Sequence, residues 1–136
     1  VISLERSRPL YEVGKEGLAA LSGQDGEMTE ALRRIQLLHA DFRGFLETAA
    51  PNSFDVIYFD PMFRYPVKRK ENSMEGFRSA AVYDPLTEDV LQFAMRAARK
   101  KVIVKERPFS ALFRTGLFTE IHGKRGQTTA YGVIKL

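Results

Sequence analysis

The sequence predicts an α/β fold whose sheet is mostly parallel, with an antiparallel pair of strands at its C-terminal edge. Short apolar runs rich in Val, Ile and aromatic residues alternate along the chain with segments of helical spacing. Two of these runs, at 54–59 and 101–105, are apolar enough to be buried on both faces, as the strands of parallel sheets are. The last two runs are separated by a short Gly-containing turn, which favours an antiparallel closing pair.

The predicted elements follow one another in a regular order, because turn and capping residues separate the apolar runs from the segments of helical spacing. Strands are expected at 1–4, 35–38, 54–59, 101–105, 118–122 and 128–136, and helices at 9–21, 27–34, 42–49 and 85–98. Residues 61–83 are rich in Lys and Arg and lack apolar periodicity, so a long connection is expected there. Loops of that length inside compact domains are usually functional.

Composition limits the class of protein. The 136 residues fit one domain, and 44% hydrophobic residues are enough for one core. The absence of Cys excludes disulfides and thiolate metal ligands and fits an intracellular protein. No apolar run is long enough to span a bilayer and the first residues lack a signal-peptide pattern, so we expect a cytoplasmic protein without a membrane partner. The net charge of +4 permits a polyanionic partner.

The stretch FDVIYFDPMF, residues 54–63, ends an apolar strand on Asp60 and Pro61. Ligands of open parallel sheets bind at the carboxyl ends of the strands, so Asp60 is the strongest candidate for a functional residue. An acid there could bind the metal of a P-loop ATPase, but the sequence contains no GxxxxGK(S/T) loop. The tetrad DPMF instead resembles the (D/N)PP(F/Y/W) motif of amino-group methyltransferases. That resemblance implies that Asp60 and the Pro61 carbonyl orient an exocyclic amine and that Phe63 stacks on the base.

Other polar residues have two interpretations each. Glu5 and Asp41 follow two further predicted strands, and each is either a solvated acid or a ligand of the ribose hydroxyls of a nucleotide. Their occurrence at successive strand ends favours the nucleotide. The basic run at 68–70 is either a solvated face or a contact with a phosphate backbone. His39 and His122 are far apart in the sequence, so we expect no metal site.

Four segments together resemble the RsmJ family of class I S-adenosylmethionine-dependent methyltransferases, which methylate the N2 amine of a guanine in small-subunit ribosomal RNA. They are LERS at 4–7, QLLHAD at 36–41, DVIYFDPMF at 55–63 and KKVIVKERP at 100–108. They occur in the order and approximate spacing of that family. The resemblance implies a Rossmann-like sheet, S-adenosylmethionine as cofactor and ribosomal RNA as partner. The alternative is a non-catalytic RNA-binding or partner module that retains the methyltransferase fold.

The same resemblance assigns a role to individual residues. It implies that Glu5 and Arg6 form the ribose-binding strand end, that Asp41 and Phe42 lie on the adenine side, and that Asp60 is shared by cofactor and target amine. Five basic residues are expected to meet phosphates of the RNA: Lys68, Arg69, Lys70, Lys105 and Arg107.

The glycine-rich loop that follows the first strand of class I methyltransferases is absent from this sequence. The glycines between residues 14 and 26 do not follow a strand in G-x-G spacing. The strand order of that class is 3-2-1-4-5-7-6, so the absent first strand belongs between the strands at 1–4 and 54–59, whose buried backbone groups need partners.

We therefore expect residues 1–136 to be the C-terminal major part of a single Rossmann-like methyltransferase domain. The start of the sequence at Val1, within an apolar run, supports the same expectation. Another chain, such as a second copy in an oligomer, or the N-terminal part of the full-length protein would supply the missing strand.

Overall fold

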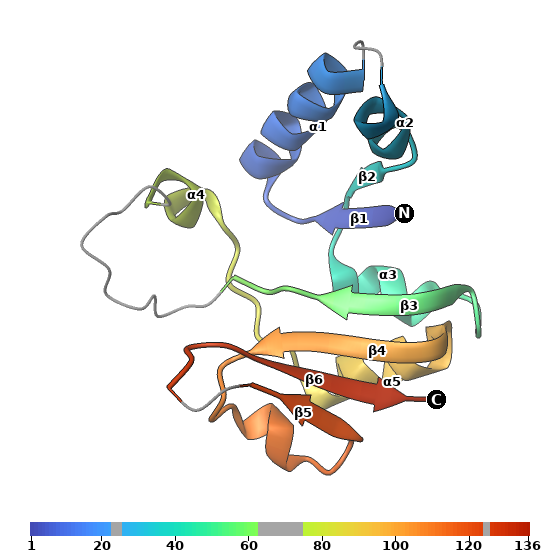
Figure 1. Cartoon of the computed structure of the whole chain (residues 1–136), viewed down its shortest axis with the longest axis vertical. Coiled ribbons are helices and arrows are strands. Elements are labelled where there is room, and N and C mark those ends of the chain that lie inside the picture. Colours follow the sequence, from blue (N-terminus) through green and yellow to red (C-terminus); the bar gives the residue numbers. More distant parts are fainter. Residues whose placement is uncertain (23–25, 63–74, 124–125) are drawn as a thin grey trace. The chain divides into compact units, whose positions relative to one another are not determined.

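The computed structural model describes residues 1–22, 26–62, 75–123 and 126–136 (Figure 1). The chain falls into two compact units. Unit 1 consists of Val1–Phe45 and Glu71–Val82, and unit 2 of Leu46–Lys70 and Tyr83–Leu136. Both units combine helices with a sheet, so the predicted α/β class is confirmed.

Unit 1 contains a two-stranded parallel sheet and the helices that pack beside it. Strand β1 (Ile2–Glu5) pairs with β2 (Gln36–His39) so that Glu5 lies opposite His39. Helix α1 (Arg8–Ser22) packs against both strands. It also packs against the helices α2 (Glu27–Arg33) and α4 (Glu75–Ala80). Because the strands are parallel, their carboxyl ends lie at the same edge of this sheet.

The start of helix α1 is fixed by Ser7, which is only 2% exposed. Its hydroxyl accepts a hydrogen bond from the Leu10 backbone N–H (3.4 Å) and donates one to the Ala80 carbonyl (2.6 Å). The first contact caps the helix, and the second connects it to the end of α4. This one side chain therefore holds together segments that are far apart in the sequence.

Helix α3 (Phe42–Thr48) begins in unit 1 and ends in unit 2. In unit 2 its Leu46 is buried. The Arg96 guanidinium, on helix α5 (Glu88–Ala97), donates to the carbonyls of Leu46 (3.0 Å) and Glu47 (2.7 Å). These bonds satisfy carbonyl groups that the end of a helix leaves without intrahelical partners.

The sheet of unit 2 has the order β3-β4-β6-β5. Strands β3 (Phe54–Phe59) and β4 (Ala98–Glu106) are parallel, whereas β6 (Ala130–Lys135) is antiparallel to both β4 and β5 (Glu120–His122). A short 3-10 helix, η1 (Ala111–Arg114), lies between β4 and β5 in the sequence. The predicted antiparallel pair at the C-terminal edge is therefore confirmed.

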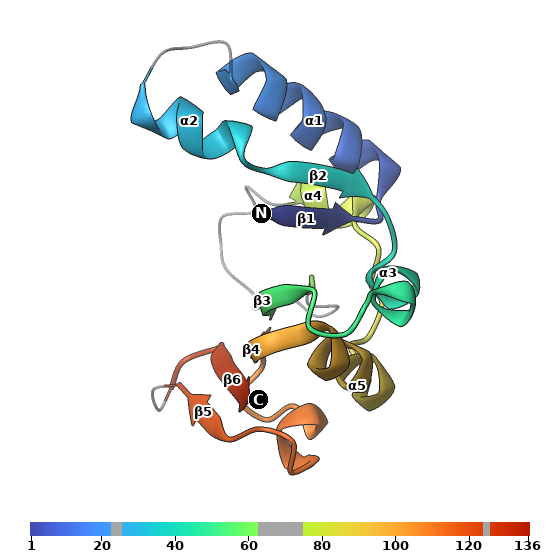
Figure 2. The same cartoon turned by 90° about the vertical axis from the view of Figure 1, so that its right-hand side faces the viewer.

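The core of unit 2 lies between this sheet and α5, which Figure 2 shows beside β4. The apolar residues of α5 recur at helical spacing, so one face of the helix is buried. The fully buried residues of the two elements are Val90, Leu91, Ala94, Ala97, Val102 and Val104. On β6, Gly132 lies under the rings of Phe113 and Phe118. These two rings pack edge to face, with their centroids 5.2 Å apart.

The expectation that strand β3 is buried on both faces is wrong for this chain. Val56 and Tyr58 are 44% and 52% exposed. Tyr58 is in register with Ile103, so it points to the face opposite the buried Val102 and Val104. An apolar strand sequence does not reveal whether both of its faces are covered.

Three further details differ from the sequence-based expectations. Helix α5 begins at Glu88 and not at Pro85, because Thr87 at its N-cap is still extended and the acids of the first turn follow it. The long connection expected at 61–83 contains α4, and η1 was not expected at all. Among the helices in the described ranges, none is long and apolar enough to cross a membrane.

Candidate functional site

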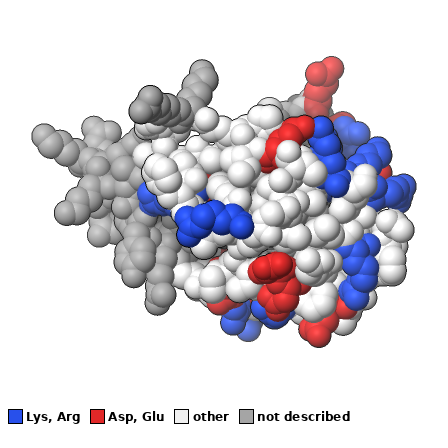
Figure 3. All heavy atoms as spheres, turned by 90° about the horizontal axis from the view of Figure 1, so that it is seen from below, with Lys and Arg blue, Asp and Glu red and all other residues white. Residues whose placement is uncertain are grey.

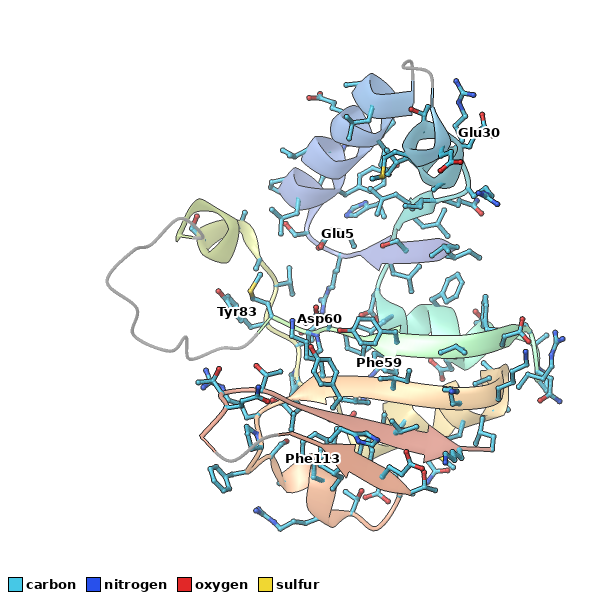
Figure 4. All side chains as sticks on the ribbon, viewed as in Figure 1. Glu5, Glu30, Phe59, Asp60, Tyr83 and Phe113 are labelled. Atoms are coloured by element: carbon cyan, nitrogen blue, oxygen red, sulfur yellow. The ribbon has the colours of Figure 1, made fainter. Side chains whose placement is uncertain are left out.

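Asp60 and Lys105 lie at the carboxyl edge of the sheet in unit 2. Phe59 of β3 is in register with Val104 of β4, so Asp60 and Lys105 are the next positions along two parallel strands. The Lys105 Nζ is 2.8 Å from Asp60 Oδ1 and 2.9 Å from Oδ2. Figure 4 shows the labelled Asp60 at the point where β3 ends. One ammonium group therefore contacts both oxygens of the predicted functional acid.

Tyr58 is the third member of this cluster. Burial raises the pKa of Tyr58 above its ordinary value of 10.0, and the neighbouring Asp60, with which it forms a hydrogen bond, raises it further. The hydrogen bond to Asp60 raises the pKa of Lys105 above 10.5, against the opposing effect of burial. The phenol and the ammonium are therefore both protonated at neutral pH, and both donate to the Asp60 carboxylate.

This arrangement presents a carboxylate in a fixed orientation to solvent. The Asp60 and Lys105 side chains are 44% and 28% exposed, so water screens their attraction and a ligand can reach them. A carboxylate has about four acceptor positions, so contacts with Lys105 and Tyr58 are compatible with a further bond from an N–H donor. The backbone carbonyl of Pro61 follows directly along the chain. The cluster therefore has the chemistry to hold an amine.

In unit 1, Glu5 and Asp41 both contact the backbone. Glu5 Oε1 accepts from the Ser7 N–H at 2.6 Å, and Asp41 Oδ2 accepts from the Gly44 N–H at 3.0 Å. The second bond caps helix α3. Glu5 is the last residue of β1, and Asp41 lies two residues after the end of β2. Because these strands are parallel, both acids lie at the same edge of the sheet, beside their sequence neighbours Arg6 and Phe42. Each acid therefore has a structural role, and each uses one of its two oxygens for it.

His39 has a structural role in unit 1. Its Nε2 lies 3.0 Å from the Arg6 carbonyl oxygen, and its ring packs against Tyr11 at 5.2 Å between centroids. These contacts connect the end of β2 with the residues that precede α1.

The structure describes only part of the predicted site. It brings Asp60 together with Lys105, for which the sequence predicts a contact with phosphates of the RNA. The contact of Lys105 with phosphates stays a prediction. The Arg107 backbone N–H donates to the carboxylate of Glu106 at 2.6 Å. Four predicted site residues lie outside the described ranges: Phe63, Lys68, Arg69 and Lys70.

Tyr58 is the site residue that the sequence analysis missed. Side chains two positions apart in a strand point to the same face, so the alternation of β3 places Tyr58 beside Asp60. That spacing was the available signal. This spacing was not used, because Tyr58 lies within an apolar run and was counted as part of the core.

Charge does not by itself identify a polyanion site on the face seen in Figure 3. There, basic and acidic side chains surround a largely uncharged area. The geometry at the strand ends and the similarity to known proteins therefore indicate function more clearly than the surface charge does.

Residues 1–128 match a family model described as "Putative SAM-dependent methyltransferase". The chain therefore belongs to this family of S-adenosylmethionine-dependent methyltransferases. The family description names the cofactor that the sequence analysis expected.

Curated relatives agree with this assignment. The chain is 31% identical over 99% of its length to the uncharacterized protein YpiP of Bacillus subtilis. It is 31% and 37% identical to proteins named ribosomal RNA small subunit methyltransferase J of Cellvibrio japonicus and Hahella chejuensis, over 98% and 100% of its length. The chain spans about half the length of these relatives, namely 52%, 53% and 51%. The resemblance to the RsmJ family is thus confirmed.

Proposed function

We propose that the protein containing this chain methylates the exocyclic N2 amine of a guanine in small-subunit ribosomal RNA. The observation that carries the proposal is the Asp60 carboxylate at the end of β3, held by Lys105 and followed by Pro61. The family match and the relatives named as ribosomal RNA methyltransferases support it.

Asp60 and the Pro61 carbonyl would accept hydrogen bonds from the two N–H groups of the amine. These bonds fix the direction of the nitrogen lone pair, so their contribution is mainly one of positioning. When bound, S-adenosylmethionine would supply a methyl group from its sulfonium sulfur and leave as the thioether S-adenosylhomocysteine. The amine nitrogen that receives the methyl group would release one N–H proton to solvent. Phe63 would stack on the guanine after it leaves the RNA stack. The basic residues at 68–70 and Arg107 would meet phosphates.

Unit 1 is proposed to bind the nucleoside part of the cofactor. Glu5 and Arg6 would bind the ribose, and Asp41 and Phe42 would lie on the adenine side. The chemistry of the residues fits this role, because a carboxylate that uses one oxygen for a backbone N–H can still accept from a hydroxyl group.

We also propose that a strand and a glycine-rich loop complete the cofactor site. In the part of the chain that the structure describes, β1 pairs only with β2, and β3 pairs only with β4. The strand order within each unit supports this proposal, because β2-β1 corresponds to strands 3-2 of the class I order and β3-β4-β6-β5 to strands 4-5-7-6. The rest of the full-length protein or another chain would supply that strand.

The test uses the full-length protein, small ribosomal subunits and S-adenosylmethionine carrying a labelled methyl group. Mass spectrometry of the nucleosides identifies the product. Asp60→Ala should lower the transfer rate by several orders of magnitude, because it removes the acceptor of the amine and positioning contributes roughly 7–11 kcal/mol in favourable cases. Asp55→Ala is the matched control, since Asp55 lies near the other end of β3 and pairs with Lys100 at 3.3 Å.

The control variant should retain transfer. Transfer by Asp60→Ala at the wild-type rate would contradict the role of Asp60. RNA binding without uptake of S-adenosylmethionine would instead identify a non-catalytic binding module. Methylation of another base would contradict the guanine assignment alone.

A further inference from the structure

Phe109 is the most exposed large hydrophobic side chain among the described residues, at 89%. Burial of a Phe side chain usually stabilises a protein by about 1.5–3 kcal/mol, and Phe109 contributes almost none of this to the fold. The ring is therefore accessible to a binding partner.

The backbone on both sides of Phe109 is held in place. The Ser110 N–H donates to the Arg107 carbonyl at 3.0 Å, which closes a four-residue turn, and Pro108 restricts that turn further. Ser110 also accepts from the Leu112 N–H at 3.3 Å and so caps η1. The Phe109 carbonyl itself accepts from Arg114 Nη1 at 3.4 Å. The turn thus holds the backbone that presents the ring to solvent.

The position of this turn points to RNA. The turn directly follows β4, at the sheet edge where Lys105 meets Asp60. Two arginines, Arg107 and Arg114, belong to the turn and to η1. An exposed aromatic ring accompanied by guanidinium groups is the combination that binds unstacked nucleotides, because the ring stacks on a base and the cations meet phosphates.

A protein partner fits this surface less well. Docking surfaces for proteins are contiguous apolar patches of several hundred Å². The apolar residues that follow Phe109, Leu112 and Phe113, are half-buried, so the ring projects almost alone.

We propose that Phe109 is a stacking platform for an unstacked base of the RNA near the target nucleotide, with Arg107 and Arg114 binding adjacent phosphates. This inference rests on the proposed function in one respect, namely that the substrate is RNA.

The test measures binding of the full-length protein to a fluorescein-labelled single-stranded oligoribonucleotide by anisotropy. Phe109→Ala should raise Kd by about 5- to 150-fold, as expected for the loss of one stacked base. Phe109→Trp should preserve the affinity, whereas Phe109→Leu should bind as weakly as the alanine variant. Ile121→Ala is the control, because Ile121 is also exposed, at 51%, but lies on β5.

The thermal melting temperature of Phe109→Ala should equal that of the wild type, since the ring packs little. Wild-type affinity of Phe109→Ala or of Phe109→Leu would overturn the stacking role, and so would an equal loss in Ile121→Ala. Methyl transfer is measured separately. A wild-type protein that binds RNA through Phe109 without methylating it would contradict the proposed function and leave the stacking role intact.

Discussion

The ion pair between Lys105 and Asp60 should matter far more for activity than for stability. Exposed pairs contribute about 0.2–1 kcal/mol, and these side chains are 28% and 44% exposed. The raised pKa of Lys105 reports the same attraction, which water screens. We therefore expect a coupling free energy of at most about 1 kcal/mol from the single variants Lys105→Met and Asp60→Asn and the double variant.

Urea denaturation of the full-length protein measures this coupling. The matched control is the pair of Asp55 and Lys100, whose side chains are 57% and 65% exposed and whose coupling should be smaller. A coupling near 3 kcal/mol or more for Lys105 and Asp60 would refute the reasoning, because it is typical of a buried structural pair. The loss of transfer in Asp60→Ala would then follow from lost structure.

The pH dependence of the pair has a definite sign. The pKa of Lys105 is raised in the folded protein above the ordinary value of 10.5. Its contribution to stability is therefore fully present below that value and is lost as pH rises through the folded value. The difference in melting temperature between wild type and Lys105→Met should therefore be constant near neutral pH and shrink only above about pH 10. A difference that disappears between pH 6 and 8 would contradict the assignment.

Three further predictions concern single side chains. Gly132→Ala should lower the free energy of unfolding by about 1–3 kcal/mol, because the new Cβ would clash with the ring of Phe118. Gly17→Ala should not destabilise the protein, because no atom lies within 4 Å of its new Cβ. Urea denaturation compares the two variants. Ser7→Ala should lower the free energy of unfolding by about 0.5–2 kcal/mol, because the cap of helix α1 is lost. An unchanged melting temperature would show that the cap is dispensable. Tyr58→Phe should remove a tyrosinate absorbance component that titrates above pH 10.0, and Asp60→Asn should move that component to lower pH.

The order of elements was predictable because apolar runs and helical spacing are local properties. Elements without such a pattern were missed: η1 is four residues long, and α4 lies in a segment without apolar periodicity. Burial was harder to predict than strand position. The sequence of β3 is the same whether one face or both are covered, so the exposure of Val56 and Tyr58 depends on packing alone.

The pairing of Asp60 with Lys105 depends on a detail of register that strand ends do not reveal. Sequence reasoning placed both residues at one edge of the sheet but assigned them to different ligands. Phe54 pairs with Ala98, but Val56 pairs with Lys101, so an irregularity between these positions moves the register by one residue. Without that shift the residue beside Asp60 would be Val104, and the alternation of side chains would turn Lys105 away from the acid. The irregularity at the start of β3 therefore decides which side chain holds the functional carboxylate at its end.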